Sequence, residues 1–142
     1  MSQTEFPTVL SQYMYDLLYE NRLPLVLEDV WEGDQNLIPR VPAICIVMGD
    51  YKRTLSGAPF RTDNEFTIYL MVYHGGVRDN QLNYRECNER AEAIMTLLHT
   101  DKTMGDNVIH GYVTGMEPGY QEKKTLMYVT RITWQGLTKT LT

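Results

Sequence analysis

Apolar residues recur at helical spacing in two segments of the chain. The first segment, Thr8–Asn21, carries one stripe made of Val9, Leu10, Tyr13, Met14, Leu17 and Leu18. Pro7 suits the first turn of a helix there, and Pro24 forbids its continuation. The second segment, Gln81–His99, carries Tyr84, Cys87, Ala91, Ile94 and Leu98 along one face. We therefore predict two main α-helices, with Asn80 as the N-terminal cap of the second.

Four other segments have the patterns of β-strands. Val41–Met48 is a continuous apolar run, which is typical of a central strand covered on both faces. Glu65–Tyr73 alternates, and one face of that strand would carry Phe66, Ile68, Leu70 and Val72. Val108–Met116 and Lys124–Gln135 are predicted as two further strands, joined by a loop around Pro118-Gly119.

The remaining segments are predicted mainly as connections. Leu25–Glu32 has β-compatible residues and is interpreted as a weak strand, followed by a loop over Gly33–Arg40. Gly49–Asn64 is interpreted as a long hairpin loop, and Thr100–Asn107 as a turn. Gly136–Thr142 is interpreted as a polar tail.

The order of these elements indicates an α+β fold. A helix and a weak strand are followed by a β-hairpin, a second helix and a second hairpin. We expect a mixed, mainly antiparallel sheet of about four to five strands with the two main helices packed on it. This order differs from the β-α-β alternation of a dinucleotide-binding fold. The length of 142 residues predicts a single domain over 1–142, with flexible ends at 1–7 and 137–142.

Composition narrows the functional classes. The chain is 43% hydrophobic and 22% charged, as in ordinary globular proteins. Its net charge of −5 argues against a nucleic-acid binder, which needs a basic patch to neutralise phosphates. Cys45 and Cys87 are expected to be small core residues. We find no signal peptide pattern and no apolar run long enough to span a membrane, so a reducing cytoplasm is the expected place of synthesis.

Motifs for catalysis or metal binding are not found. None of the three histidines has a second histidine or a cysteine at metal-ligand spacing, and His74 and His99 are expected to be solvated at the ends of elements. Gly75-Gly76 is interpreted as a turn that ends a strand. The pairs Glu28-Asp29 and Glu89-Glu92 fall on predicted solvent faces. We therefore predict no catalytic residue, no cofactor and no bound metal.

Interface residues are the alternative to an active site. A hairpin usually needs 2–5 connecting residues, whereas Gly49–Asn64 provides about fifteen, and loops of that length are usually functional or disordered. The candidate residues for contact with a neighbouring subunit or partner are Tyr51, Lys52, Arg53, Leu55, Phe60 and Arg61. A solvated, mobile loop is the competing interpretation. The tyrosines of the first helix are a second candidate surface, or simply half-buried fillers.

Several stretches of the sequence resemble one family. These are "VPAICIVMGDYKR", "DNEFTIYLMVYH", "NERAEAIMTLLHTDKTMGDNVIHGYV" and "LMYVTRITWQGLTKT". In this order, from about Val9 to Lys139, the chain resembles the tail terminator family of long-tailed bacteriophages, also called tail completion or head-to-tail joining proteins. The stretches "LLHTDKTMGD" and "ITWQGLTKT" carry most of the resemblance. The chain differs from common members in its longer stretch between the first helix and the Val41 strand.

The resemblance implies a structural virion protein and no enzyme. Members of this family form a hexameric ring on the last ring of the tail tube, stop its growth, and present a surface to the head connector and stopper proteins. DNA passes through the ring without specific binding. The implied location is the head-tail junction of the virion, after synthesis in the host cytoplasm. The alternatives are another phage neck component, such as a head-closure or connector adaptor protein, a small enzyme or ligand-binding domain, and an interaction module unrelated to phages.

Overall fold

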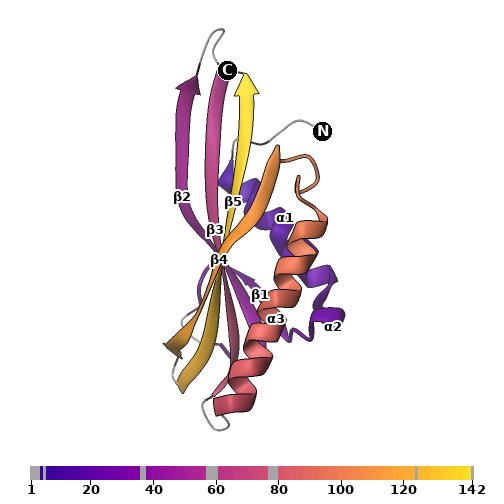
Figure 1. Cartoon of the computed structure of the whole chain (residues 1–142), viewed down its shortest axis with the longest axis vertical. Coiled ribbons are helices and arrows are strands. Elements are labelled where there is room, and N and C mark those ends of the chain that lie inside the picture. Colours follow the sequence, from indigo (N-terminus) through magenta and orange to yellow (C-terminus); the bar gives the residue numbers. More distant parts are fainter. Residues whose placement is uncertain are drawn as a thin grey trace.

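The computed structural model describes residues 4, 6–35, 38–56, 61–76, 80–123 and 125–141. Its elements follow the chain as α1 (Pro7–Glu20), α2 (Arg22–Leu25), β1 (Asp29–Glu32), β2 (Ala43–Ser56), β3 (Arg61–Gly76), α3 (Asn80–Thr100), β4 (His110–Lys123) and β5 (Thr125–Leu141). The helices lie on one side of a twisted sheet (Figure 1).

The sheet has five strands in the order β1-β2-β3-β5-β4. β1 pairs with β2 in parallel, and the other neighbouring strands are antiparallel. This arrangement confirms the predicted α+β class with a mixed, mainly antiparallel sheet. β2 lies inside the sheet, as its continuous apolar run predicted.

The two main helices form where the periodicity predicts them. Pro7 occupies the start of α1, where a missing N–H costs nothing. Asn80 is the first residue of α3 instead of its cap, a shift of one position that is common at helix ends. On α3 the stripe residues Cys87, Ala91, Ile94 and Leu98 are buried, whereas Tyr84 is 51% exposed.

The segment Leu25–Glu32 is only partly a strand, which corrects the prediction. Arg22–Leu25 forms a single helical turn that accepts Pro24, because the first turn of a helix needs no N–H from that position. Val26 then takes a left-handed conformation with φ of 56° and ends the turn. Strand β1 begins only at Asp29.

The predicted long loop over Gly49–Asn64 is wrong. β2 continues to Ser56 and pairs with β3 from Arg61 onward, and only 57–60 connects the two strands. A register shift between Met48 and Tyr51 marks a bulge, after which the pairing resumes. The strand was missed because its pairing depends on backbone hydrogen bonds, while its side chains are mostly polar and show no apolar alternation.

Two further segments that were predicted as a loop and a tail also form strands. Pro118-Gly119, predicted as a loop, lies within β4, where proline is tolerated because β4 is an edge strand. The predicted tail from Gly136 is likewise wrong, since β5 runs to Leu141 and pairs there with Arg61 of β3. The flexible end expected over 137–142 is therefore strand through Leu141.

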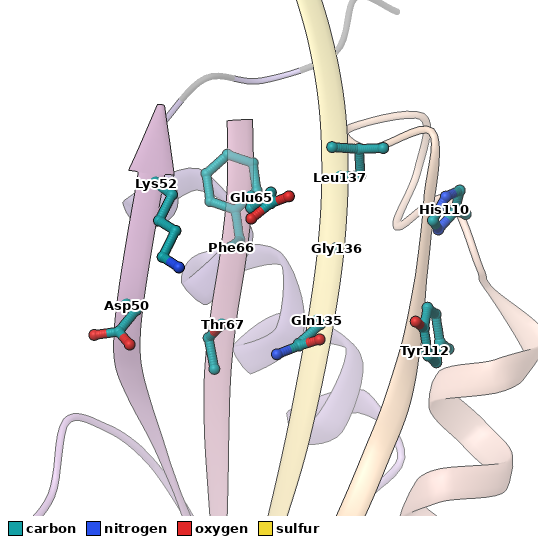
Figure 2. A pocket seen from close by; sticks show the side chains of 10 residues that line it. All are labelled: Asp50, Lys52, Glu65, Phe66, Thr67, His110, Tyr112, Gln135, Gly136 and Leu137. Carbon is teal, nitrogen blue, oxygen red and sulfur yellow. The ribbon is translucent and has the colours of Figure 1, made fainter. Parts of the chain in front are cut away.

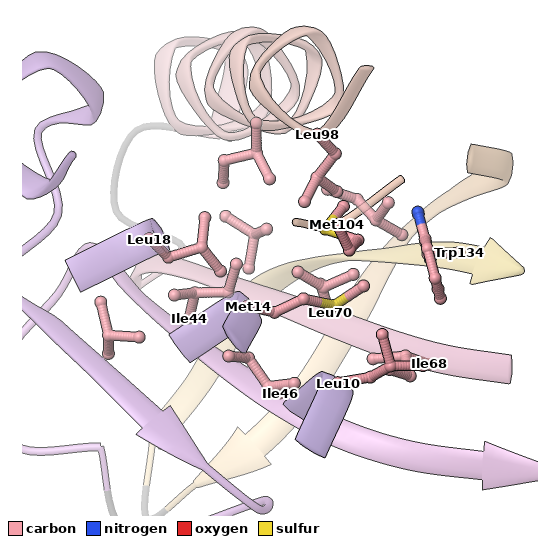
Figure 3. Close-up of a cluster of buried hydrophobic side chains, with 14 of the residues drawn as sticks. Leu10, Met14, Leu18, Ile44, Ile46, Ile68, Leu70, Leu98, Met104 and Trp134 are labelled. Carbon is pink, nitrogen blue, oxygen red and sulfur yellow. The ribbon is translucent and has the colours of Figure 1, made fainter. Parts of the chain in front are cut away.

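The larger hydrophobic core lies between the helices and the sheet (Figure 3). Its fully buried side chains include Leu10, Met14, Leu18, Ile44, Ile46, Ile68, Leu70, Leu98 and Trp134. A smaller cluster on the other face of the sheet comprises Ile38, Ala43, Cys45, Tyr73, Met127 and Val129. The first part of β2 is thus covered on both faces. Cys45 and Cys87 are both buried, as predicted.

Candidate interaction surface

The candidate interface residues lie on an extended hairpin formed by β2 and β3. With the end of β5, these strands reach beyond the helices at the top of Figure 1. Lys52, Arg53, Leu55 and Arg61 are exposed there, and the structure thus brings them together on one projecting end. Phe60, the remaining candidate apart from Tyr51, lies outside the described residues.

Tyr51 fixes the base of this projection. Its ring lies 5.2 Å from the ring of Phe66, measured between centroids, and its hydroxyl donates to Asn64 Oδ1 at 3.2 Å. Asn64 Nδ2 in turn donates to Thr138 Oγ1 at 2.9 Å, which links β3 to β5. The strands of the projection are therefore joined by side chains as well as by the backbone.

The two faces of the projection differ. Leu55 is 66% exposed and shares the helix side of β2 with Tyr51 and Arg53, whereas Lys52 points to the opposite side. On that opposite side, Lys52 lines an open groove of about 300 Å³ (Figure 2). The groove is lined by Asp50, Lys52, Glu65, Phe66, Thr67, His110, Tyr112, Gln135, Gly136 and Leu137. Its mixture of acidic and basic groups suits polar contacts with a protein surface.

The sequence did not reveal this groove, because its walls come from four strands. The pairing register places Lys52 beside Glu65, Glu65 beside Leu137, and Leu137 beside His110. Period-two alternation could have shown which residues of each strand share a face. The order of the strands, which brings them side by side, is set by the tertiary fold.

A second groove, of about 390 Å³, lies between α1 and β1; we call it the α1–β1 groove. It is lined by Tyr15, Tyr19, Arg22, Asp29, Val30, Trp31, Glu32 and Arg40. The Tyr15 and Tyr19 rings stack with centroids 5.7 Å apart, and the Arg22 guanidinium lies 3.5 Å from the Tyr19 centroid. Arg40 and Asp29 form an ion pair at 2.6 Å. The tyrosines of the first helix, the second predicted candidate surface, thus form one wall of a groove.

His74 is buried, which corrects the expectation that it is solvated. Its Nδ1 lies 2.7 Å from an Arg90 guanidinium nitrogen, and its Nε2 lies 3.2 Å from the Glu86 carboxylate. Burial, and then the positive charge of Arg90, lower the pKa of His74. Arg90 Nε also donates to the Leu25 carbonyl at 3.1 Å. The cluster therefore ties α3 to the end of β3 and to α2.

Other parts of the chain accept hydrogen bonds from some N–H groups at the outer edge of β4. Gly111 N donates to the Lys102 carbonyl at 2.7 Å, and Val113 N donates to His99 Nε2 at 3.0 Å. These two N–H groups point away from β5 and are already satisfied. His99, expected to be solvated, therefore has a structural partner. At the opposite edge of the sheet, β1 pairs with β2 only from Ala43 to Ile46.

The residues that the structure describes hold no group of three or more His, Cys, Asp or Glu side chains placed to bind a metal ion. Among the same residues, no helix is both long enough and apolar enough to cross a bilayer.

No protein-family model and no curated protein matches this chain. Among solved structures, the chain is similar to one chain of "Virion of native gene transfer agent (GTA) particle", with a TM-score of 0.49 and 11% sequence identity. The matched region covers 90% of this chain and 93% of that chain.

Proposed function

We propose that this chain is a structural virion protein that forms the tail terminator ring of a phage-like particle. The observation that carries the proposal is the projecting β2–β3 hairpin. It presents the exposed side chains of Leu55, Lys52, Arg53 and Arg61 beyond the layer of helices. Exposed apolar groups rimmed by charge are typical of surfaces that bind other proteins.

The construction of the hairpin supports a binding role. Paired strands, together with the hydrogen bonds from Tyr51 to Asn64 and from Asn64 to Thr138, hold it in one conformation. A surface that is ordered before binding loses less conformational entropy when a partner docks. The hairpin is therefore better suited to a rigid assembly contact than the solvated, mobile loop of the competing interpretation would be.

The two sides of the molecule differ, as a ring subunit requires. A ring closes through head-to-tail contacts between two different surfaces of each copy. Here one surface is the basic, apolar hairpin, and another is the α1–β1 groove with its stacked tyrosines. In this proposal six copies form the ring, the tail tube protein lies below it, and the head connector or stopper protein lies above.

The same proposal has consequences for catalysis and for contact with DNA. A ring subunit works through its interfaces and needs no cofactor or catalytic residue. A net charge of −5 on each copy disfavours a firm grip on phosphates, so DNA would pass through the hole without specific binding. The proposed location is the head-tail junction.

Electron microscopy of particles made without this protein tests the proposal. We expect tails of uncontrolled length and heads without attached tails, because nothing would stop the tube or join it to the head. Tails of normal length that lack heads would instead favour a head-closure or connector adaptor protein. Normal particles would overturn any role at the junction. Purified protein that binds isolated tail tubes and not empty heads would support the terminator over the adaptor.

A further inference from the structure

We propose that the β2–β3 hairpin of one copy docks against the α1–β1 groove of the next copy. The inference deepens the proposed ring, since it rests on the chain assembling with copies of itself. It states that these two surfaces bind each other, and it names the residues that make the contact.

The end of the hairpin carries basic residues on both faces, with Arg53 and Leu55 on the helix side of β2 and Lys52 on the opposite side. Within 51–62 the charged residues are Lys52, Arg53 and Arg61, whereas Asp50, Asp63 and Glu65 flank this stretch and Glu65 pairs with Lys52 across the strands. The three basic residues are exposed. Leu55 is 66% exposed at the same end. The basic residues thus prevail only within 51–62, towards the end of the hairpin, on a chain with a net charge of −5.

The surroundings of the groove provide the opposite charge. Residues 8–40 contain the six carboxylates Asp16, Glu20, Glu28, Asp29, Glu32 and Asp34, against the two arginines Arg22 and Arg40. Asp16 and Glu20 are exposed on α1, next to the groove residues Tyr15 and Tyr19, and Glu28 is exposed just before β1. Oppositely charged surfaces attract each other and fix the register of a contact.

Apolar groups at the groove match those of the hairpin. Tyr19 is 43% exposed, Leu23 is 91% exposed and Val26 is 60% exposed, all at the corner between α1 and β1. Stacked tyrosines offer large, rigid contact area of the kind found at the centres of interfaces. Leu55 and its neighbours therefore have an apolar surface to cover, and that surface lies beside the carboxylates.

The contact cannot form within one copy. The groove lies at the level of Ala43–Ile46, where β1 pairs with β2. Ser56 at the hairpin end is ten residues further along β2 than Ile46, or roughly 30 Å at the usual rise of a strand. Since the two surfaces are far apart on one rigid sheet, their contact joins different copies head to tail. Repetition of such a contact closes a ring when the rotation allows it.

Charge reversal on each surface tests this contact. The hairpin variant carries Lys52→Glu, Arg53→Glu and Arg61→Glu, and the groove variant carries Asp16→Lys, Glu20→Lys and Glu28→Lys. Arg85→Glu with Lys102→Glu is the control for reversal of surface charge, because both cations are exposed and neither belongs to the hairpin or lines the groove. Self-association is measured by sedimentation of the full chain over a range of protein concentrations at low salt.

We expect the wild type and the control to associate alike, and each reversal variant alone to associate about tenfold or more weakly. An equal mixture of the two variants should recover association, because an acidic hairpin then meets a basic groove while the unmodified surfaces also pair. Absence of wild-type association up to the solubility limit would overturn the inference. So would a hairpin variant that associates normally, or a mixture that does not recover.

The same variants separate this inference from the proposed function. If the variants associate normally and the protein still caps tails, the contact is wrong and the ring proposal stands. If each reversal variant associates weakly and their mixture recovers, but deletion of the protein leaves particles normal, the contact is right and the terminator role is wrong. Binding of the hairpin to tail tube protein, with no contact between copies, would also overturn the inference.

Discussion

The indole of Trp134 lies against the backbone of Gly111 on the neighbouring strand. A Cβ atom placed on Gly111 would come within 1.9 Å of Trp134 Cζ2, a distance that real atoms do not tolerate. Trp134 is fully buried beneath the helices, so the ring has little room to move. The absence of a side chain at Gly111 is what lets β4 cover the tryptophan.

Gly111→Ala should therefore destabilise the protein by roughly 1–3 kcal/mol or more, the usual cost of overpacking a core. Urea denaturation monitored by tryptophan fluorescence gives the free energy of unfolding. Gly115→Ala on the same strand is the matched control, because nothing lies within 4 Å of a Cβ there. Equal stability of the two variants would show that the Trp134 ring can move aside.

Ile94→Ala should lower the free energy of unfolding by roughly 2–5 kcal/mol, the range for removing a large buried aliphatic side chain. Ile94 is 0% exposed and packs in the larger core. The exposed neighbour Glu92→Ala should change stability by at most about 0.5 kcal/mol. A denaturation curve for Ile94→Ala that overlays the wild type would contradict the packing of α3 on the sheet.

The His74 cluster predicts that stability declines in mild acid. The pKa of His74 is lowered in the folded protein, chiefly by burial and then by Arg90, so near and below its ordinary value of 6.5 the folded chain binds fewer protons than the unfolded chain. The free energy of unfolding should then fall as the pH falls from 6.5 through the lower pKa of the folded state, with no contribution from His74 above that window.

Urea denaturation at several pH values between about 8 and 5 measures this dependence. His74→Gln should give a shallower decline, because that side chain does not take up a proton. His110→Gln, at an exposed histidine, is the control and should keep the slope of the wild type. A slope that is the same in all three proteins would remove His74 as its source.

The hairpin should be needed for assembly and not for folding. Substitution of Lys52, Arg53 and Arg61 by serine removes exposed charges and should leave the circular dichroism spectrum near normal. A second variant lacks Leu55, Ser56, Arg61 and Thr62, which are two cross-strand pairs, so the register of the rest of the hairpin is kept. We expect both proteins to fold and yet fail to cap tails, as counted by electron microscopy.

Arg85→Ser with Lys102→Ser is the matched control for the loss of charge, and particles made with it should be normal. Normal particles from both hairpin variants would show that the projection is dispensable. The stacked tyrosines of α1 would then become the main candidate for contact with partners.

Elements that produce a local hydrophobic periodicity could be predicted from the sequence. The stripes of α1 and α3 and the apolar alternation around Ile68 and Leu70 gave the right elements and the α+β class, because burial imposes those periods. The strands beyond Met48 and Gly136 were missed, since polar side chains in paired strands leave no such period. Their existence depends on backbone pairing with β3.

The candidate site was predicted in part for a similar reason. The composition of 49–64 indicates Lys52, Arg53 and Leu55 as candidates, and they are exposed on one hairpin, but local composition does not predict their strand conformation. The burial of His74 was missed because it depends on Arg90 and Glu86, which approach it only when α3 packs on the sheet. Contacts between segments that are distant in the sequence cannot be predicted from a local pattern.

The hydrogen bonds that cover part of the β4 edge bear on aggregation through exposed strands. Bare strand edges recruit other strands and seed fibrils, so proteins made in many copies need to blunt them. Here His99 Nε2 and the Lys102 carbonyl accept the N–H groups that a foreign strand would use, and Pro118 offers none further along β4. That stretch of the β4 edge therefore has fewer N–H groups available to pair with a strand of another molecule.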